Sequence, residues 1–185
     1  PPAFDRQGST VDNLIDFTPE LRAEALELVK HYKTGPVFTP PSTRTETNRG
    51  TIQLPGSHGG SDFQGAAFDP ETHYLFVPSI TAPFVADIQP GDPAKTNLSF
   101  MKGTRAWIGG PQGLPMFKPP YGRNRASNMN TGEIVWQVPN GVGPRDHPAI
   151  RHLKLGRLGS PGRPSPPARE APLFIREGSG FLGGG

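Results

Sequence analysis

Two stretches of the chain share one turn-and-strand pattern, and this repeat constrains the fold more than any other feature. Residues 67–77 read AFDPETHYLFV and residues 126–136 read ASNMNTGEIVW. The matched pairs lie 59 positions apart: Ala67 and Ala126, Asp69 and Asn128, Thr72 and Thr131, His73 and Gly132, and Val77 and Trp136. An Asp or Asn bonds the turn backbone, and Gly accepts a positive φ. The pattern predicts two β-hairpins, the first with arms near 65–69 and 73–78.

The spread of glycine and proline points to a loop-rich, all-β fold. The 185 residues include 24 glycines and 24 prolines, and apolar bursts separate them along the whole chain. The repeat distance is longer than the roughly 40–50 residues of common propeller blades. We therefore expect residues 80–122 to form an inter-blade loop, residues 156–171 to form a Pro/Arg-rich linker, and the apolar burst at 172–180 to begin another strand.

One stretch has helical character. Thr18 is a good N-cap, Pro19 suits the first helical position, and Glu20 suits the positive end of the helix dipole. The apolar residues that follow keep helical spacing, and Gly35 with Pro36 prevents continuation. The sequence predicts a helix inserted near 19–33.

Charge and cysteine content exclude several classes of function. The formal net charge is +3, which argues against nucleic acid as the main partner. Cysteine is absent, so this segment has no disulfide, thiolate metal site or cysteine nucleophile. No run of about 18 apolar residues is present to span a membrane. The chain begins at Pro1 without a Met and ends just after an apolar run, so we expect a fragment.

The glycine-rich loop at residues 58–63, HGGSDF, is the most informative candidate site. Glycine allows the backbone to approach a ligand closely. Phe63 offers a face for stacking on a planar ring, and Asp62 offers a hydrogen-bond acceptor or a cation ligand. The predicted binding residues are therefore Asp62 and Phe63.

Several motifs together resemble a known family. GPVFTPPS, GTIQLPGSHGG, GAAFDPETHYLFVPS, PPYG and MNTGEIVWQVPNG are similar, in order and approximate spacing, to the C-terminal part of pyrroloquinoline-quinone (PQQ)-dependent dehydrogenases of the membrane glucose dehydrogenase type. The resemblance covers residues from about 15 to 160. It implies a β-propeller of about eight four-stranded blades, of which this chain supplies two to three.

The resemblance also implies a chemistry. PQQ accepts a hydride from a sugar or alcohol, a Ca²⁺ or Mg²⁺ ion polarises the quinone, and electrons pass to ubiquinone at the periplasmic face of the inner membrane. Asp62 and Phe63 occupy places where the family commonly has an Asn or acidic residue followed by Trp. The general-base Asp, the quinone-contacting Lys and any membrane anchor lie outside this segment, so we assign no catalytic residue and no metal ligand. We expect the fragment to be inactive alone.

The chain departs from the family pattern in two places. Arg123-Asn124-Arg125-Ala126 stands where an apolar strand is expected and, by our interpretation, cannot fill a buried strand face. Residues 166–176 depart likewise.

Two hypotheses stand as alternatives to a quinoprotein dehydrogenase. They are a non-catalytic β-propeller that acts as a binding or scaffold module, and a Gly/Pro-rich extracellular segment with little fold. The substrate stays open among glucose, other aldoses, quinate-like polyols and simple alcohols.

Overall fold

The structure is a computed structural model that describes residues 2–3, 5–62 and 65–162. Phe63, most of the expected linker and the expected strand at 172–180 lie outside these residues. In the described part, strands predominate and α1 (Pro19–Val29) is the single α-helix, which confirms the all-β prediction. The strands are β1 (Gly8–Ser9), β2 (Gly35–Pro36), β3 (Ser42–Thr43), β4 (Thr51–Gln53), β5 (Ala67–Asp69), β6 (Tyr74–Ile80), β7 (Phe84–Pro90), β8 (Phe100–Trp107), β9 (Gly122–Asn128) and β10 (Ile134–Pro139).

The chain forms two compact units that alternate along the sequence. Unit 1 takes residues 1–6, 58–82 and the chain from Pro119 onward, and unit 2 takes residues 7–57 and 83–118. Each unit contains one four-stranded sheet.

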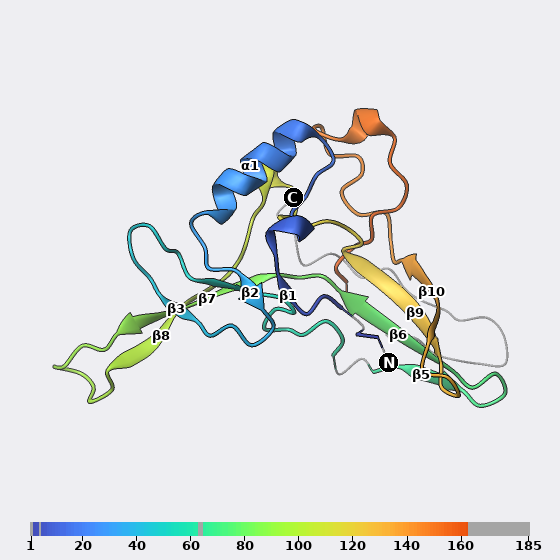
Figure 1. The fold of residues 1–185 in the computed structure, drawn as a ribbon, viewed down its shortest axis with the longest axis horizontal. Coiled ribbons are helices and arrows are strands. Elements are labelled where there is room, and N and C mark those ends of the chain that lie inside the picture. Colours follow the sequence, from blue (N-terminus) through green and yellow to red (C-terminus); the bar gives the residue numbers. More distant parts are fainter. Residues whose placement is uncertain (1, 4, 63–64, 163–185) are drawn as a thin grey trace. The chain divides into compact units, whose positions relative to one another are not determined.

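Unit 1 is built on an antiparallel sheet of order β10–β9–β6–β5 (Figure 1). Both predicted hairpins are present: β5 pairs with β6, and β9 pairs with β10. β6 also pairs with β9 along seven residues, from Tyr74 opposite Asn128 to Ile80 opposite Gly122. The two repeats therefore share one sheet. Our interpretation that an inter-blade loop separates them was wrong. A turn pattern predicts a hairpin, but it does not show which strand pairs with the free edge of that hairpin.

The two hairpin turns have the same conformation at the matched positions. His73 has a φ of 57° and Gly132 a φ of 76°, as the His-for-Gly match predicts. The second hairpin differs by a bulge, since its pairing passes from Ile134 to Trp136. The Trp136 ring packs on Phe76 with centroids 5.9 Å apart. Trp136 of β10 and Phe76 of β6 both lie opposite the fully buried Ala126 of β9. Trp136 therefore packs within its own sheet and stabilises it.

The turn carboxylate of the first hairpin gives a pH prediction. The Thr72 hydroxyl donates to Asp69 at 2.5 Å and the Glu71 N–H at 3.0 Å, and both bonds lower the pKa of Asp69. Because the folded-state pKa lies below the unfolded one, this stabilisation is complete above the ordinary Asp pKa and is lost as pH falls through the folded value. We expect an NMR titration midpoint for Asp69 below that of a model peptide.

A matched comparison for this titration lies in the same sheet. Asn128 holds the equivalent turn through its Oδ1, which accepts from the Asn130 N–H at 2.8 Å, and an amide does not titrate. The Asn128 side chain should therefore show no titration of its own, while the Asp69 carboxyl titrates. Thr72→Val should raise the Asp69 midpoint. A midpoint at or above the peptide value would contradict the prediction.

Loop residues after β10 pack directly on the start of β9. The Asn140 N–H donates to the Gly122 carbonyl at 2.8 Å, and the Leu158 carbonyl accepts from the Tyr121 N–H at 2.8 Å. A Cβ added to Gly122 would lie 1.9 Å from the Ser160 carbonyl oxygen. One added to Gly159, which has a φ of 80°, would lie 2.1 Å from the Gly122 oxygen. Glycine is needed at both positions because a side chain at either one would prevent the backbone of residues 159–160 from contacting Gly122.

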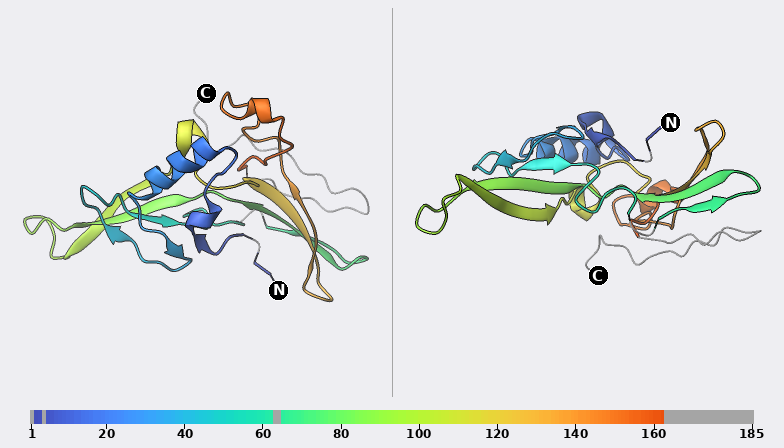
Figure 2. Two further views of the ribbon diagram at one scale, coloured as in Figure 1. Left: turned by 45° about the horizontal axis from the view of Figure 1, so that its top comes forward. Right: turned by 90° about the horizontal axis from the view of Figure 1, so that it is seen from below.

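Unit 2 is built around β7, which pairs with β4 and β8 antiparallel and with β3 parallel. β7 and β8 lie within residues 80–122, so the prediction of a loop there was wrong. The β7–β8 pair forms a long hairpin, visible in both views of Figure 2. The apolar residues of this unit are buried among its strands, α1 and the segment before Lys118: Leu14, Ile15, Leu21, Ala25, Ile52, Leu54, Phe84, Val85, Leu114, Met116 and Phe117.

Helix α1 begins where the sequence predicts and ends earlier. The Thr18 hydroxyl accepts from the Leu21 N–H at 3.2 Å, which confirms the N-cap. Leu21, Ala25 and Val29 form its buried face. The helix stops at Val29 instead of residue 33, because the His31 carbonyl and the Lys33 N–H bond the backbone of residues 49 and 50.

Candidate functional site

The structure describes the glycine-rich loop up to Asp62. Gly59 has a φ of 72°, and the Asp62 carbonyl accepts from the Gly65 N–H at 2.9 Å. The Asp62 residue is half-buried. Phe63 lies outside the described residues, so its predicted stacking role stays a prediction.

Gly60 has an internal reason to be glycine. A Cβ added at Gly60 would lie 2.9 Å from both Cβ and Oδ2 of Asp5. The Gly60 carbonyl accepts from the Ile80 N–H at 2.7 Å, at the end of β6. The close backbone approach that the sequence suggested for a ligand is thus made here to the side chain of Asp5.

Asp5 belongs to a buried ion pair beneath this loop. Arg123 Nη2 lies 2.6 Å from Asp5 Oδ1, and the two side chains are 3% and 2% exposed. The same carboxylate oxygen accepts from the Arg6 N–H at 2.7 Å and from the Thr81 hydroxyl at 3.2 Å. Arg123 further donates to Thr81 Oγ1 at 2.6 Å and, through Nε, to Ser79 Oγ at 2.9 Å.

These contacts correct the interpretation that residues 123–126 cannot fill a buried strand face. Arg123 and Asn124 are each 3% exposed in β9, and Ala126 is fully buried. A guanidinium is tolerated there because a carboxylate neutralises it and two hydroxyls accept further donors. Sequence reasoning missed Asp5 because it lies 118 residues away. One local signal was present: Ser79, opposite Arg123, and Thr81 place hydroxyls beside a buried arginine.

Two further arginines extend the positive charge of this region. Burial lowers the pKa of Arg6, and the nearby charge of Arg123 lowers it further while Asp5 partly offsets both. Burial and Arg123 act on the pKa of Arg125 in the same way. Arg6 donates to the Pro119 carbonyl at 3.0 Å, and Arg125 donates to the Ala3 carbonyl and to Gln137. Arg125 therefore also ties Ala3 to β9, and Arg6 bonds the segment just before β9.

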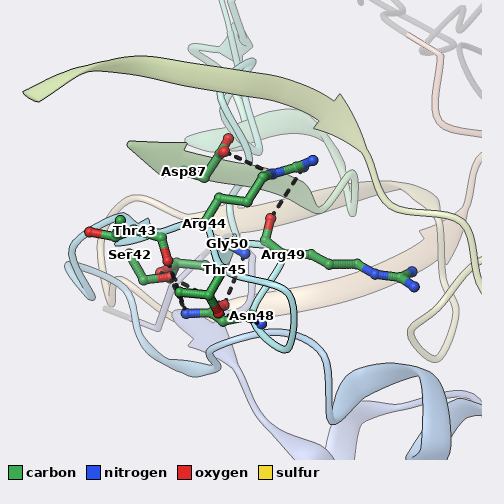
Figure 3. A network of polar contacts seen from close by, with 9 residues as sticks. Ser42, Thr43, Arg44, Thr45, Asn48, Arg49, Gly50 and Asp87 are labelled. Carbon is green, nitrogen blue, oxygen red and sulfur yellow. Dashed lines mark hydrogen bonds and ion pairs between the residues drawn. The ribbon is translucent and has the colours of Figure 1, made fainter. Parts of the chain in front are cut away.

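Unit 2 contains a second Asp–Arg pair, in which only the carboxylate is buried, shown in Figure 3. Arg44 Nε lies 3.0 Å from Asp87 Oδ2, with the Asp87 side chain fully buried and the Arg44 side chain 43% exposed. Asp87 stands at a register shift between β7 and β8. A Cβ at Gly103 would lie 2.5 Å from its carboxylate, so the glycine makes room for it.

Asn48 organises the loop that carries Arg44 (Figure 3). Its Oδ1 accepts from the Gly50 N–H at 2.9 Å, and its Nδ2 donates to Ser42 Oγ at 3.1 Å. The Asn48 N–H donates to Thr45 Oγ1 at 3.0 Å. The polar stretch at 43–50 is thus an ordered turn network that supports Arg44.

Unit 2 also has a cleft of about 240 Å³ between two of the motifs that carry the family resemblance. Phe38 at this cleft is 95% exposed. The lining residues are Pro36, Val37, Phe38, Thr39, Ile52, Gln53, Leu54 and Pro55. They carry no charge, so the cleft offers apolar contact and few polar groups.

The described residues contain no group of three or more His, Cys, Asp or Glu side chains placed to hold a metal ion. Within the same residues, no helix is long and apolar enough to cross a membrane. Asp62 on its own offers a cation one carboxylate.

Comparison with known proteins finds a family and several distant relatives. A family profile described as the glucose/ethanol/alcohol dehydrogenase β-propeller domain, PQQ, matches residues 1–179. Quinoprotein glucose dehydrogenase A of Acinetobacter calcoaceticus is 26% identical over 141 residues, covering 68% of this chain and 17% of that protein. Quinate/shikimate dehydrogenase (quinone) of Acinetobacter baylyi is 30% identical over 125 residues, covering 57% of this chain and 15% of that protein.

A third relative gives the same picture. Quinoprotein glucose dehydrogenase of Escherichia coli is 28% identical over 121 residues, covering 55% of this chain and 14% of that protein. The chain thus spans less than a fifth of the length of these relatives.

Proposed function

Because this chain belongs to the glucose/ethanol/alcohol dehydrogenase β-propeller family, we propose that it is part of a quinoprotein that oxidises a sugar or an alcohol. When bound, PQQ supplies the hydride acceptor, and the protein binds and orients the reactants. We place the enzyme at the periplasmic face of the inner membrane, with electrons passing to ubiquinone. The names of the relatives favour glucose and quinate-like polyols as substrates.

The observation that carries this proposal is the glycine-rich loop with its half-buried Asp62. The loop backbone is fixed at Gly60 by β6 and by Asp5, and Asp62 follows two residues later. A half-buried acceptor on a fixed loop fits contact with one edge of a flat, polar ligand. Asp62 and, from the sequence, Phe63 form one wall of the site. The chain alone has no turnover, because the remaining walls belong to other parts of the enzyme.

The described residues do not fit a complete cation site. Asp62 contributes at most one ligand side chain, and Ca²⁺ takes six to eight oxygen ligands. The ligands of a Ca²⁺ or Mg²⁺ ion are therefore expected outside the described residues, and we derive no step through a metal.

A non-catalytic propeller that acts as a scaffold is the second candidate. It is favoured by one observation: the space at Gly60 is occupied by Asp5, so the glycine is explained without any ligand. Binding of PQQ by the full-length protein separates the two candidates.

The test is a PQQ titration of the full-length apoprotein with and without Asp62→Ala. Losing one hydrogen bond to a bound ligand costs about 1.4 kcal/mol, so the dissociation constant should rise about tenfold. Asp146→Ala is the matched control, since the Asp146 side chain in the same unit is 84% exposed. Absence of PQQ binding by the wild type would support the scaffold, and equal affinities in wild type and Asp62→Ala would remove Asp62 from the site.

A further inference from the structure

We propose that Arg123 is a positioning residue, which acts through Asp5 to fix the glycine-rich loop and so to set where Asp62 meets a ligand. The part of this inference that concerns PQQ rests on the proposed function. The part that concerns the loop rests on the contacts of unit 1 alone.

The first step is that the ion pair has a single geometry. Asp5 Oδ1 receives three donors, from the Arg6 backbone, Thr81 and Arg123. Arg123 in turn bonds Asp5 and the hydroxyls of Ser79 and Thr81. Ser79 is in β6 and Thr81 follows directly, while Arg123 is in β9. The carboxylate is therefore held by Arg123 of β9 and by Thr81, which directly follows β6.

The second step is that the loop rests on this carboxylate. The Gly60 backbone lies so close to Asp5 that even one methyl group would be 2.9 Å from its Cβ and Oδ2. On the other side, the Gly60 carbonyl accepts the Ile80 N–H at 2.7 Å. Asp5 and β6 thus fix Gly60 between them, and a shift of Asp5 alters one of these two supports.

The third step connects Gly60 to the half-buried Asp62. Only Ser61 separates them, and the Asp62 carbonyl is held in a turn by Gly65 at 2.9 Å. A displacement at Gly60 is therefore transmitted to Asp62 over two residues of a constrained backbone. In this way Arg123, a side chain on β9 that touches no ligand, determines the position of Asp62, which contacts the ligand.

Stability alone does not account for a buried charge pair. Removing two charges from water is costly, and apolar residues of the same volume often stabilise as well or better. What the pair provides is a defined direction for the Asp5 carboxylate, set by the planar guanidinium. Lysine at position 123 would keep the charge but not the planar set of donors that reaches Asp5, Ser79 and Thr81 together.

The test uses Arg123→Lys in the full-length protein, with Arg44→Lys as a matched control. Both variants make the same change in an Asp–Arg pair with a buried carboxylate, although Arg44 is more exposed than Arg123, and the Arg44–Asp87 pair lies in unit 2. We would measure amide hydrogen exchange of Ile80 and Gly65, whose N–H groups bond the loop carbonyls of Gly60 and Asp62, and the dissociation constant for PQQ of the apoprotein. Arg123→Lys should accelerate loop exchange and weaken PQQ binding, each about tenfold. Arg44→Lys should change neither, although it lowers stability.

The outcomes separate this inference from the proposed function. Faster loop exchange with no PQQ binding by the wild type would support the positioning of the loop and reject the proposed function. Faster exchange with unchanged PQQ affinity would overturn the ligand part of the inference. Unchanged exchange, or equal effects of Arg123→Lys and Arg44→Lys, would overturn the whole inference. If Arg123→Lys does not fold, Thr81→Val removes one buried hydroxyl of the network with little change of shape and serves the same test.

Discussion

Arg123→Met is expected to lower the free energy of unfolding of unit 1 by about 3–5 kcal/mol. The substitution removes the Arg123 guanidinium, the direct ion-pair partner of the Asp5 carboxylate, whose side chain is 2% exposed. Trp136 lies in the sheet of unit 1, and the other tryptophan, Trp107, lies in unit 2. A Trp107→Phe background therefore allows urea unfolding of unit 1 to be followed by Trp136 fluorescence.

The double variant Asp5→Asn with Arg123→Met is the control for this prediction. It removes both charges, so the cost of burying the Asp5 carboxylate without Arg123 no longer applies. We expect it to recover more than half of the stability that the single variant loses. The typical net value of one hydrogen bond is about 1 kcal/mol. A smaller loss of stability in the single variant would mean that the Asp5 carboxylate is hydrated, and would contradict its burial.

Gly122→Ala is expected to destabilise the same unit by about 1–3 kcal/mol or more, because overpacking here requires backbone movement. The new methyl group would lie 1.9 Å from the Ser160 carbonyl oxygen, and no side-chain rotation relieves a contact with backbone. Urea unfolding in the same Trp107→Phe background measures the change.

Gly156→Ala is the matched control in unit 1. A Cβ at Gly156 meets no heavy atom within 4 Å, and the residue has no positive φ. Alanine there should leave stability unchanged or raise it by up to about 1 kcal/mol, through a less flexible unfolded chain. Equal stability of the two alanine variants would contradict the packing of residues 158–160 on β9.

Local chemistry made the hairpins and the helix start predictable. Asp69 and Asn128 each bond the turn backbone as their residue types suggest, and Thr18 caps α1. The family match confirms the resemblance to PQQ-dependent propeller domains, which rested on several motifs in order. These features depend on residues that are close together in sequence, so one sequence is enough to read them.

Long-range partners explain what the sequence could not show. Arg123 seemed incompatible with a buried strand because its carboxylate partner comes from the N-terminal lead-in. Gly60 suggested a ligand, whereas the side chain against it is Asp5. The repeat suggested separate blades, but strand pairing placed both hairpins in one sheet. In each case the deciding contact joins segments whose proximity no local pattern encodes.

The order of strands in unit 1 affects how the chain leaves the ribosome. Ile80 and Gly122 are paired, yet the whole of β7 and β8 is synthesised between them. Until β9 emerges, β6 has only the short β5 beside it, and its other edge can pair with any extended chain nearby. Translation speed through residues 81–121 therefore sets how long a nascent chain exposes that edge, and slow codons there would favour aggregation.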